Sequence, residues 1–246
     1  MKTARFKRFL FCIVLSTLLF ISFSVSLEAQ ERVPDYLRYH FLSQEEMEAQ
    51  EHFQPRDFTP TDPPPAPVVN IAEFNQMEGV LVRYPLGIPV SLVAEMAEVA
   101  MVTTIVQNAS QETTVRNMYS SGGVDLDNCN FMYASSDSYW ARDYGPWFVL
   151  DGNYELGIVN FPYNRPRPND DDVPIHVADF LGINLFGMNL EHTGGNYMTD
   201  GMGISASTDL IWEENSGLSH EDVDQLMNDY LGINTYHVLP DPLADY

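Results

Sequence analysis

The sequence is short of positive charge. Its 246 residues include 12 lysines and arginines against 35 aspartates and glutamates, a formal net charge of −23. No lysine follows Lys7, so every later basic side chain is an arginine. A surface of this sign repels phosphate chains and anionic lipid, so neither nucleic acid nor a membrane is an expected partner of the mature chain. It attracts cationic ligands, although a general gain in solubility explains most of the charge equally well.

Cysteine and the common catalytic motifs are scarce too. Cys12 lies in the N-terminal apolar run and Cys129 in the apolar segment 129–135, where we expect a core residue rather than a nucleophile. None of the six histidines has ligand spacing to another histidine or to Cys129, so no metal site is predicted. There is no G-x-S-x-G elbow, and the loop HTGGNYMTDGMG (192–203) has neither the P-loop pattern nor a lysine. That loop is predicted to be a tight turn, with His192 as an exposed acid–base candidate.

Long apolar runs are absent except at the N-terminus. Four basic residues within positions 2–8 precede FLFCIVLSTLLFISFSV, which predicts a signal peptide over residues 1–29. We therefore expect a secreted, periplasmic or cell-surface protein, with an uncleaved signal anchor as the alternative. Residues 30–68 are predicted to be an N-terminal segment and an extended Pro-rich linker, TPTDPPPAPVV, so the compact domain is expected over 69–246.

Strands and helices alternate along the domain, which predicts an α/β fold. The strands are expected at 79–85, 101–107 and 129–135, the helices at 89–100 and about 110–120, and a hairpin around Asp151-Gly152.

A repeat of 50 residues supports a modular architecture. DFLGIN at 179–184 recurs as DYLGIN at 229–234, each with a glycine placed to end a helix before a strand. Paired strands are expected before each helix, at 146–161 and at about 203–213. With 77–135 as a diverged copy, the pattern predicts three strand-strand-helix-strand units that bury their faces against one another. A chance match of six residues is the alternative.

Each of the last two units is expected to open on an aromatic residue with an acid three positions later. These pairs are Trp140 with Asp143 and Tyr197 with Asp200, and we expect their acids to converge at one site.

Residues 138–172 hold the elements of a binding site. Asp143 can accept two parallel hydrogen bonds from a guanidinium, and Trp140 can cover its flat face. Arg165 and Arg167, separated by a proline in a segment predicted to be extended, point to one side and can grip a carboxylate. A ligand with both groups is arginine or a peptide that ends in arginine. The alternatives are an Arg142–Asp143 structural pair, a core role for Trp140, and arginines that balance the acids 170–172.

Four segments together resemble a known family. They are EFNQMEGVLVRYP (73–85), YWARDYGPW (139–147), YNRPRPNDDD (163–172) and HTGGNYMTDG (192–201). In this order they resemble the secreted bacterial peptidylarginine deiminases, relatives of the agmatine deiminases in the guanidino-group-modifying pentein superfamily. The resemblance runs from about residue 69 to the end. It implies an α/β propeller of five strand-strand-helix-strand units, of which this chain would hold about three.

The resemblance also implies roles for individual residues. Asp143 would clamp the substrate guanidinium, Trp140 would pack along the arginine side chain, Arg165 and Arg167 would hold the peptide's C-terminal carboxylate, and Tyr246 would form part of the substrate wall. In the family a cysteine thiolate attacks the guanidinium carbon, a histidine helps ammonia to leave, and water releases citrulline. This chemistry needs no redox cofactor.

One part of the family pattern is not matched. The family's catalytic His-x-Asp pair follows the segment that matches DPLADY (241–246), and its cysteine lies further on. We therefore expect a C-terminally truncated member that holds the substrate-binding half and is inactive as this chain. The alternatives are a non-catalytic module that binds arginine-ended peptides, a deiminase that acts on agmatine, and an enzyme that uses Cys129.

Overall fold

The computed structural model describes residues 44–50 and 58–242 of the chain. The chain divides into two compact units, one up to His52 and one from Phe53. The first contributes helix α2 (Gln44–Gln50), and the second holds all other elements described below. The predicted signal peptide and Tyr246 lie outside the described residues. Within the described ranges, no helix has both the length and the apolar character needed to cross a bilayer.

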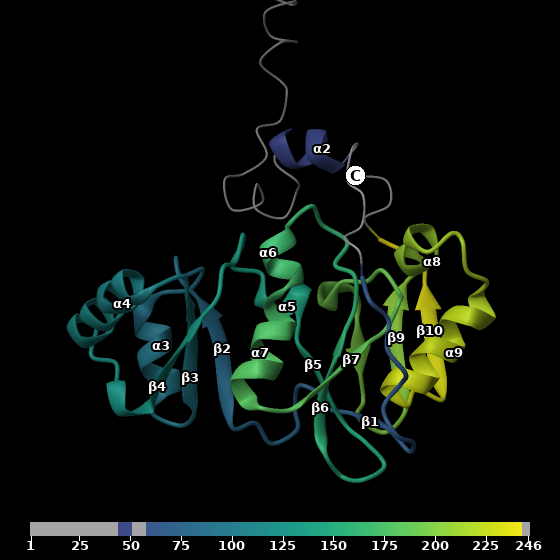
Figure 1. Ribbon diagram of the computed structural model, residues 1–246, viewed down its shortest axis with the longest axis horizontal. Coiled ribbons are helices and arrows are strands. Elements are labelled where there is room, and N and C mark those ends of the chain that lie inside the picture. The colour runs from purple at the N-terminus through teal and green to yellow at the C-terminus, as the bar shows by residue number, and fades with distance from the viewer. Residues whose placement is uncertain (1–43, 51–57, 243–246) are drawn as a thin grey trace, which may run out of the picture. The chain divides into compact units, whose positions relative to one another are not determined.

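Three small sheets form the frame of the second unit and follow one another from left to right in Figure 1. The mixed α/β class predicted from the sequence is confirmed. The strands are β2 (Gly79–Arg83), β3 (Met101–Val106) and β4 (Cys129–Tyr133) in the first sheet, β1 (Val69–Asn70), β5 (Trp147–Leu150), β6 (Leu156–Asn160) and β7 (Asn184–Gly187) in the second, and β8 (Met198–Thr199), β9 (Ile204–Thr208) and β10 (Thr235–Leu239) in the third.

The second and third sheets share one plan. In each, an antiparallel hairpin is followed by a helix that crosses over to a parallel strand: β5–β6, α7 (Val173–Leu181) and β7, then β8–β9, α9 (His220–Leu231) and β10. Both helices end on a left-handed glycine, Gly182 and Gly232, each with φ of 67°. Glycine adopts this conformation at little cost. The helix ends predicted from the DFLGIN and DYLGIN repeats are therefore confirmed.

The first sheet departs from the predicted unit. Its three strands are all parallel and are joined by two helices, α3 (Val90–Ala97) and α4 (Ala109–Ser121), so the expected strand-strand hairpin is absent from residues 77–135. The connection from β2 to β3 is long enough for a helix, whereas a hairpin needs only two to five residues. The individual strands and helices predicted for this segment are confirmed, but they do not form the strand-strand-helix-strand unit predicted for this copy.

The third sheet corrects a second expectation. The paired-strand segment predicted at about 203–213 is strand only as far as Thr208, and α8 (Leu210–Glu214) follows. The Asn215 side chain donates to the carbonyl of Ile211 at 2.8 Å and closes this helical turn. Two further short helices, α5 (Ala141–Tyr144) and α6 (Pro168–Asp171), and the 3-10 helices Leu126–Asn128 and Gly194–Asn196 complete the unit.

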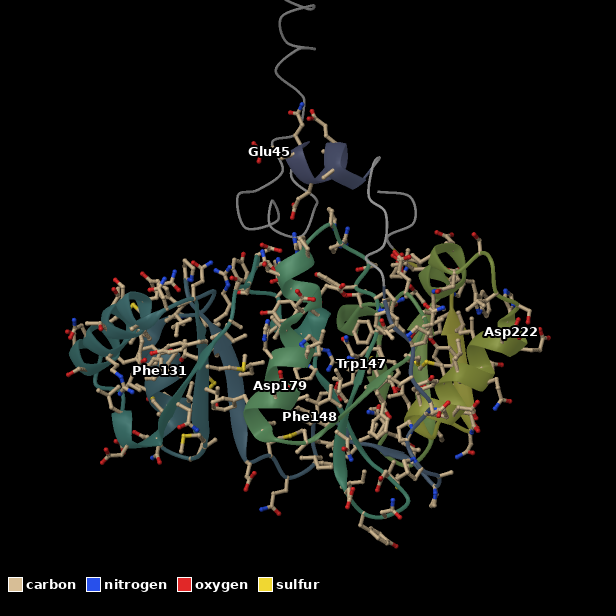
Figure 2. All side chains as sticks on the ribbon, in the orientation of Figure 1. Glu45, Phe131, Trp147, Phe148, Asp179 and Asp222 are labelled. Carbon is tan, nitrogen blue, oxygen red and sulfur yellow. The ribbon has the colours of Figure 1, made fainter. Side chains whose placement is uncertain are left out.

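Both faces of the second sheet are buried, because consecutive apolar side chains of its strands point to opposite faces. Figure 2 labels two consecutive residues of β5 that illustrate this, Trp147 and Phe148. Trp147 belongs to the core shared with the third sheet, while Phe148 packs with Ile158 against the core shared with the first sheet. A third core lies under α3 and α4 and contains Cys129, a buried free thiol. The prediction that Cys129 is a core residue is confirmed.

The Pro-rich segment is part of the second unit and packs against its helices and turns. The Tyr230 hydroxyl donates to the carbonyl of Thr61 at 2.5 Å, and the amide of Gly152 donates to the carbonyl of Pro65 at 2.6 Å. A Cβ at Gly232 would lie 1.9 Å from the Val68 carbonyl oxygen. These contacts, made by residues that the sequence assigned to a linker, place positions 61–68 within the compact unit, beside α9 and the β5–β6 turn.

Candidate functional site

The predicted binding residues lie at one edge of the sheets, where the parallel strands end. We call this region the carboxyl edge and define it by the connections that follow β4, β6 and β7, residues 134–146, 161–172 and 188–197. Open α/β sheets place ligand sites at this end of their strands. Trp140 and Asp143 belong to the first connection, and Arg165 and Arg167 to the second.

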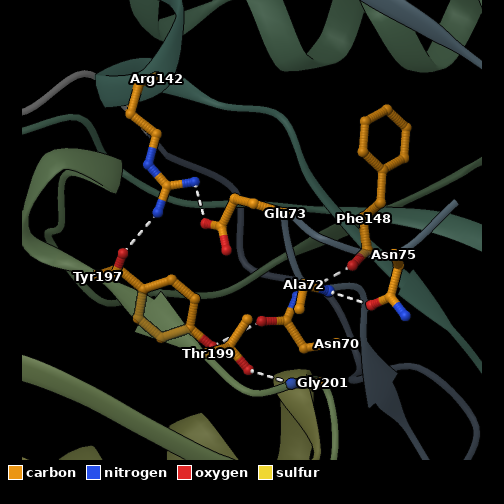
Figure 3. Close-up of polar contacts among 9 residues, drawn as sticks. All are labelled: Asn70, Ala72, Glu73, Asn75, Arg142, Phe148, Tyr197, Thr199 and Gly201. Atoms are coloured by element: carbon orange, nitrogen blue, oxygen red, sulfur yellow. Dashed lines mark hydrogen bonds and ion pairs between the residues drawn. The ribbon is translucent and has the colours of Figure 1, made fainter. Parts of the chain in front are cut away.

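Helix α5 carries Asp143 and is tied to the segment after β1. Arg142 donates to the carbonyl of Tyr197 at 2.5 Å and forms an ion pair with Glu73 (Figure 3). The Tyr197 hydroxyl in turn donates to Asn70 Oδ1 at 2.6 Å. Arg142 therefore has Glu73 as an acidic partner, whereas the alternative drawn from the sequence paired it with Asp143. This contact holds the first turn of α5 in place beside Asp143.

Two consecutive glycines allow the third connection to approach α5. A Cβ at Gly194 would lie 2.0 Å from the Arg142 carbonyl oxygen, and one at Gly195 would lie 2.6 Å from Asp143 Oδ1. Both distances are shorter than any ordinary contact, so a larger residue at either position would force its neighbour to shift. The Asp143 carboxylate thus rests directly against the backbone of Gly195. The tight turn predicted from the glycines is present as the 3-10 helix Gly194–Asn196.

The arginine segment is folded rather than extended. The amide of Arg167 donates to the carbonyl of Arg165 at 2.7 Å, which closes a three-residue turn around Pro166. Arg167 then precedes Pro168, the first residue of α6. Proline favours this first helical position because its missing N–H has no helical partner there. The extended conformation predicted for this segment was wrong, and so was the strand-like alternation used to orient its arginines.

Tyr163 lies where the charges of three predicted residues meet. Burial raises the pKa of its hydroxyl, the negative charge of Asp143 raises it further, and the positive charges of Arg167 and Arg165 oppose the rise. Arg167 Nη1 lies 3.5 Å from the Tyr163 hydroxyl oxygen. Arg167 is thus the predicted residue that contacts this buried hydroxyl, while Asp143 and Arg165 act on it through their charges. Trp140, one turn before Asp143, is partly buried and packs on Tyr139 with 4.8 Å between ring centroids.

A buried carboxylate that sequence reasoning passed over holds the loop before Trp140. Asp170, fully buried, accepts hydrogen bonds from the amides of Asp137 and Ser138 at 2.7 and 3.1 Å and from the Ser138 hydroxyl at 2.6 Å. Burial raises the pKa of this carboxyl although the hydrogen bonds lower it. Asp170 is the first member of the acid triplet 170–172, but no local pattern separates it from its neighbours.

Sequence reasoning also missed a hydrogen-bonded pair next to the arginine turn at 165–167. Asn164, almost fully buried, donates through Nδ2 to Glu214 Oε1 at 2.6 Å. Burial raises the pKa of Glu214 to about 7; the Asn164 bond opposes this rise, the charge of Glu191 adds to it, and Arg165 opposes it. Glu214 ends α8, so this contact links the second and third sheets.

His192 and Asp200 do not occupy the positions expected of them. His192 is fully buried rather than exposed, with Trp147 edge-on at 4.9 Å between centroids, and burial lowers the pKa of its imidazole to about 3. Its Nδ1 accepts from the amide of Thr193 at 2.8 Å. Asp200 accepts from the amides of Met202 and Ile204 in the β8–β9 turn, at the other end of the hairpin from the carboxyl edge. In the repeat, Asp200 occupies the same position as Asp151 of the β5–β6 turn. The prediction that Asp200 and Asp143 converge at one site was therefore wrong.

No group of three or more histidine, cysteine, aspartate or glutamate side chains is placed to hold a metal ion, as far as the described residues extend.

The same edge carries the motifs that relate the chain to known proteins. Residues 88–246 match the Porphyromonas-type peptidyl-arginine deiminase family. The chain belongs to this family. It is also 30% identical over 136 residues to the agmatine deiminase of Ectopseudomonas mendocina, a match that covers 49% of this chain and 36% of the relative. The family resemblance identified from the sequence is confirmed.

Solved structures of agmatine deiminases share the fold. That of Enterococcus faecalis superposes with a TM-score of 0.59 at 22% identity, covering 69% of this chain and 52% of the other. That of C. jejuni gives a TM-score of 0.59 at 17% identity, covering 71% and 56%. The chain thus spans about half the length of these structures and less than half of its curated relative. Members of this deiminase family hydrolyse C–N bonds of guanidino groups.

Proposed function

We propose that this family member binds an arginine side chain at the carboxyl edge and supplies the substrate-binding part of a peptidyl-arginine deiminase. In that reaction, water replaces one guanidinium nitrogen, which leaves as ammonia, and peptidyl-citrulline remains. The preferred ligand is a peptide that ends in arginine, since its guanidinium and carboxylate match the two kinds of charge at this edge.

One observation carries this proposal. Asp143, Arg165 and Arg167 come from two separate connections at the same edge, Arg167 Nη1 lies 3.5 Å from the hydroxyl oxygen of buried Tyr163, and the charges of Asp143 and Arg165 also act on that hydroxyl. An acid and two arginines placed around one partly buried point are complementary to a ligand that has a cation at one end and an anion at the other. Trp140 on the same helix as Asp143 would cover the guanidinium or the methylene chain behind it.

The described part of the chain offers a binding site without an attacking group. Cys129 lies at the start of β4, at the opposite end of that strand from the carboxyl edge, and its sulfur contacts the Asp125 carbonyl at 3.3 Å. Burial and the charge of Asp125 raise the pKa of this thiol, which opposes formation of the thiolate. We therefore propose that Cys129 is not a nucleophile and that this chain alone releases no citrulline.

We also propose that the three sheets are consecutive units of a propeller. The shared hairpin–helix–strand plan of the second and third sheets and the cores on both faces of the second sheet support this proposal.

We also propose that residues 1–29 are a signal peptide that is cleaved on export. N-terminal sequencing of the protein recovered outside the cytoplasm would test it, and an intact Met1 on all of the protein would contradict it.

Binding of an N-acetylated peptide ending in arginine, measured by calorimetry, tests the proposed function. Asp143→Asn should weaken binding roughly 10- to 100-fold, because a hydrogen bond to a charged group contributes about 1.5–3 kcal/mol. The matched control is Asp179→Asn, which removes the same charge from an exposed position on α7, labelled in Figure 2. Equal affinity of Asp143→Asn and the unchanged chain, or no binding by either, would contradict the proposal.

An agmatine-type ligand is the second candidate, because the curated relative reported above is an agmatine deiminase. Agmatine has the guanidinium but no carboxylate. If it binds more tightly than the arginine-ended peptide, the arginine turn does not select for a carboxylate.

A further inference from the structure

A continuous chain of hydrogen bonds joins the two halves of the proposed site. The amide of Asp143 donates to the carbonyl of Trp140 at 2.9 Å, and the amide of Trp140 donates to Ser138 Oγ at 3.3 Å. Ser138 Oγ donates in turn to Asp170 Oδ2 at 2.6 Å, and the amide of Asp170 donates to the carbonyl of Arg167 at 3.1 Å. The chain thus leads from the acid proposed to bind the guanidinium to an arginine proposed to bind the carboxylate.

The arginine end of this chain has little freedom. The amide of Arg167 donates to the carbonyl of Arg165 at 2.7 Å, so the two arginines share one turn. Arg167 lies between Pro166 and Pro168, and each proline ring fixes its own φ at about −65°. Because Asp170 is bonded to the Arg167 carbonyl, the backbone that carries both arginines is held to the rest of the chain of hydrogen bonds.

Further hydrogen bonds tie the same two connections together in both directions. The amides of Asp137 and Ser138 donate to Asp170 Oδ1 at 2.7 and 3.1 Å. The amide and the side-chain Nδ2 of Asn169 donate to the carboxylate oxygens of Asp137 at 2.9 and 2.6 Å. Each connection therefore supplies a carboxylate to an amide of the other, and Asp170 is fully buried. The connection that carries Asp143 cannot slide along the one that carries the arginines without breaking several of these bonds.

We propose that Ser138 and Asp170 are positioning residues that fix the separation between Asp143 and the arginine turn at 165–167, so that the site selects ligands by the distance between their two charges. This inference rests on the proposed function, since it concerns the two halves of the same site. It adds a length requirement: a peptide that ends in arginine fits, whereas one that ends in homoarginine, with one more methylene, does not.

The physical reason is that the ligand is held at two points. The second contact strengthens binding only when the separation of the two protein groups matches that of the two ligand groups. In a site of fixed dimensions, one added methylene costs about 10- to 200-fold in discrimination. If the two connections moved independently, the site would adapt to the longer side chain and most of this discrimination would be lost.

Four peptides measure the length requirement. Two are N-acetylated peptides that differ only in ending in arginine or homoarginine, and the other two are the same peptides with a C-terminal amide. Calorimetry gives the dissociation constant of each. We expect the arginine-ended acid to bind about tenfold or more tightly than the homoarginine-ended acid. The two amides should bind alike, because they lack the carboxylate and are held at one point.

Three variants distinguish positioning from a merely structural role. Ser138→Ala removes the hydroxyl that joins Asp170 to the Trp140 amide and keeps the backbone amides bonded to Asp170, so the ratio of the two acid affinities should fall toward one. Ser138→Thr keeps a hydroxyl and should restore the ratio. Ser135→Ala is the matched control, since it makes the same change at an exposed serine of the same connection. It should leave the ratio unchanged. Urea unfolding of the same preparations checks that each variant is folded.

The outcomes separate this inference from the proposed function. If the unchanged chain binds both acids alike but Asp143→Asn weakens their binding, the length requirement is overturned and the site stands. An unchanged ratio in Ser138→Ala would overturn the inference as well. So would an equal weakening of all four peptides in that variant, because it would show a structural role only. The absence of binding by any of the four peptides would overturn both proposals.

Discussion

The adjacent glycines of the Gly-rich connection give a prediction that separates folding from binding. At Gly195, an added Cβ would lie 2.6 Å from Asp143 Oδ1, about 0.8 Å short of an ordinary contact. The obstructed atom is the end of a side chain, so the carboxylate can move away without displacing backbone. At Gly194, the added Cβ would lie 2.0 Å from the Arg142 carbonyl oxygen, which is backbone of α5.

The expected magnitudes differ in kind. Gly195→Ala should change the free energy of unfolding by less than about 1 kcal/mol, whereas Gly194→Ala should reduce it by about 1–3 kcal/mol, as overpacking does. A shift of the Asp143 carboxylate by about 0.8 Å removes at least one bond of a two-bond guanidinium contact, about 1.5–3 kcal/mol. Gly195→Ala should therefore weaken binding of an arginine-ended peptide about 10- to 100-fold.

Urea unfolding and calorimetry on the same preparations test both parts. Gly217→Ala is the control, because a Cβ there meets no atom within 4 Å and the glycine has no positive φ. The reasoning would be refuted if Gly195→Ala bound the peptide as well as the unchanged chain. It would be refuted equally if Gly194→Ala proved as stable as Gly195→Ala, since the backbone contact would then carry no energy.

Two further predictions concern stability. Gly182→Ala and Gly232→Ala carry the same left-handed strain, about 1–2 kcal/mol, but only the second meets a neighbour, the Val68 carbonyl at 1.9 Å; urea unfolding should show the larger loss for Gly232→Ala, and equal losses would mean that positions 61–68 are not packed as described. Asp170→Ala should lower the free energy of unfolding by about 1–3 kcal/mol, because the buried amides of Asp137 and Ser138 lose their acceptor; Asp172→Ala is the comparison, and equal effects would contradict the role of Asp170 as an anchor.

The sequence was informative where the decisive contacts are local. The glycine ends of α7 and α9 follow from the residues of one helix turn, and the hairpin at Asp151-Gly152 follows from the turn itself. The order of strands and helices follows from short-range periodicity in the same way. The glycine ends of the two helices recur 50 residues apart because each unit forms its helix end from its own local contacts.

Features that depend on distant contacts were missed or misplaced. The loop containing His192 is polar and glycine-rich, which is typical of exposed loops, yet the ring packs against Trp147 of β5 and Phe161 of the connection after β6. The segment around Pro166 was predicted to be extended. Proline occurs in extended segments and in turns, so the sequence alone does not distinguish the two. The structure has a turn there, closed by the Arg167 amide, and α6 begins directly after it. Pairs such as Asn164 with Glu214, 50 positions apart, leave no local pattern.

Three carboxyl groups near the arginine turn show why residue type alone could not assign roles in so acidic a chain. Asp170 is fully buried and accepts three hydrogen bonds from one loop, so it serves the fold. Glu214 is partly buried beside Glu191, so its protonation can change near neutral pH. Asp143 rests against Gly195 and its charge acts on Tyr163, so we propose it as the acid that meets a ligand cation. Burial and neighbours, rather than the abundance of acids, distinguish the group proposed to bind from the groups that hold the fold.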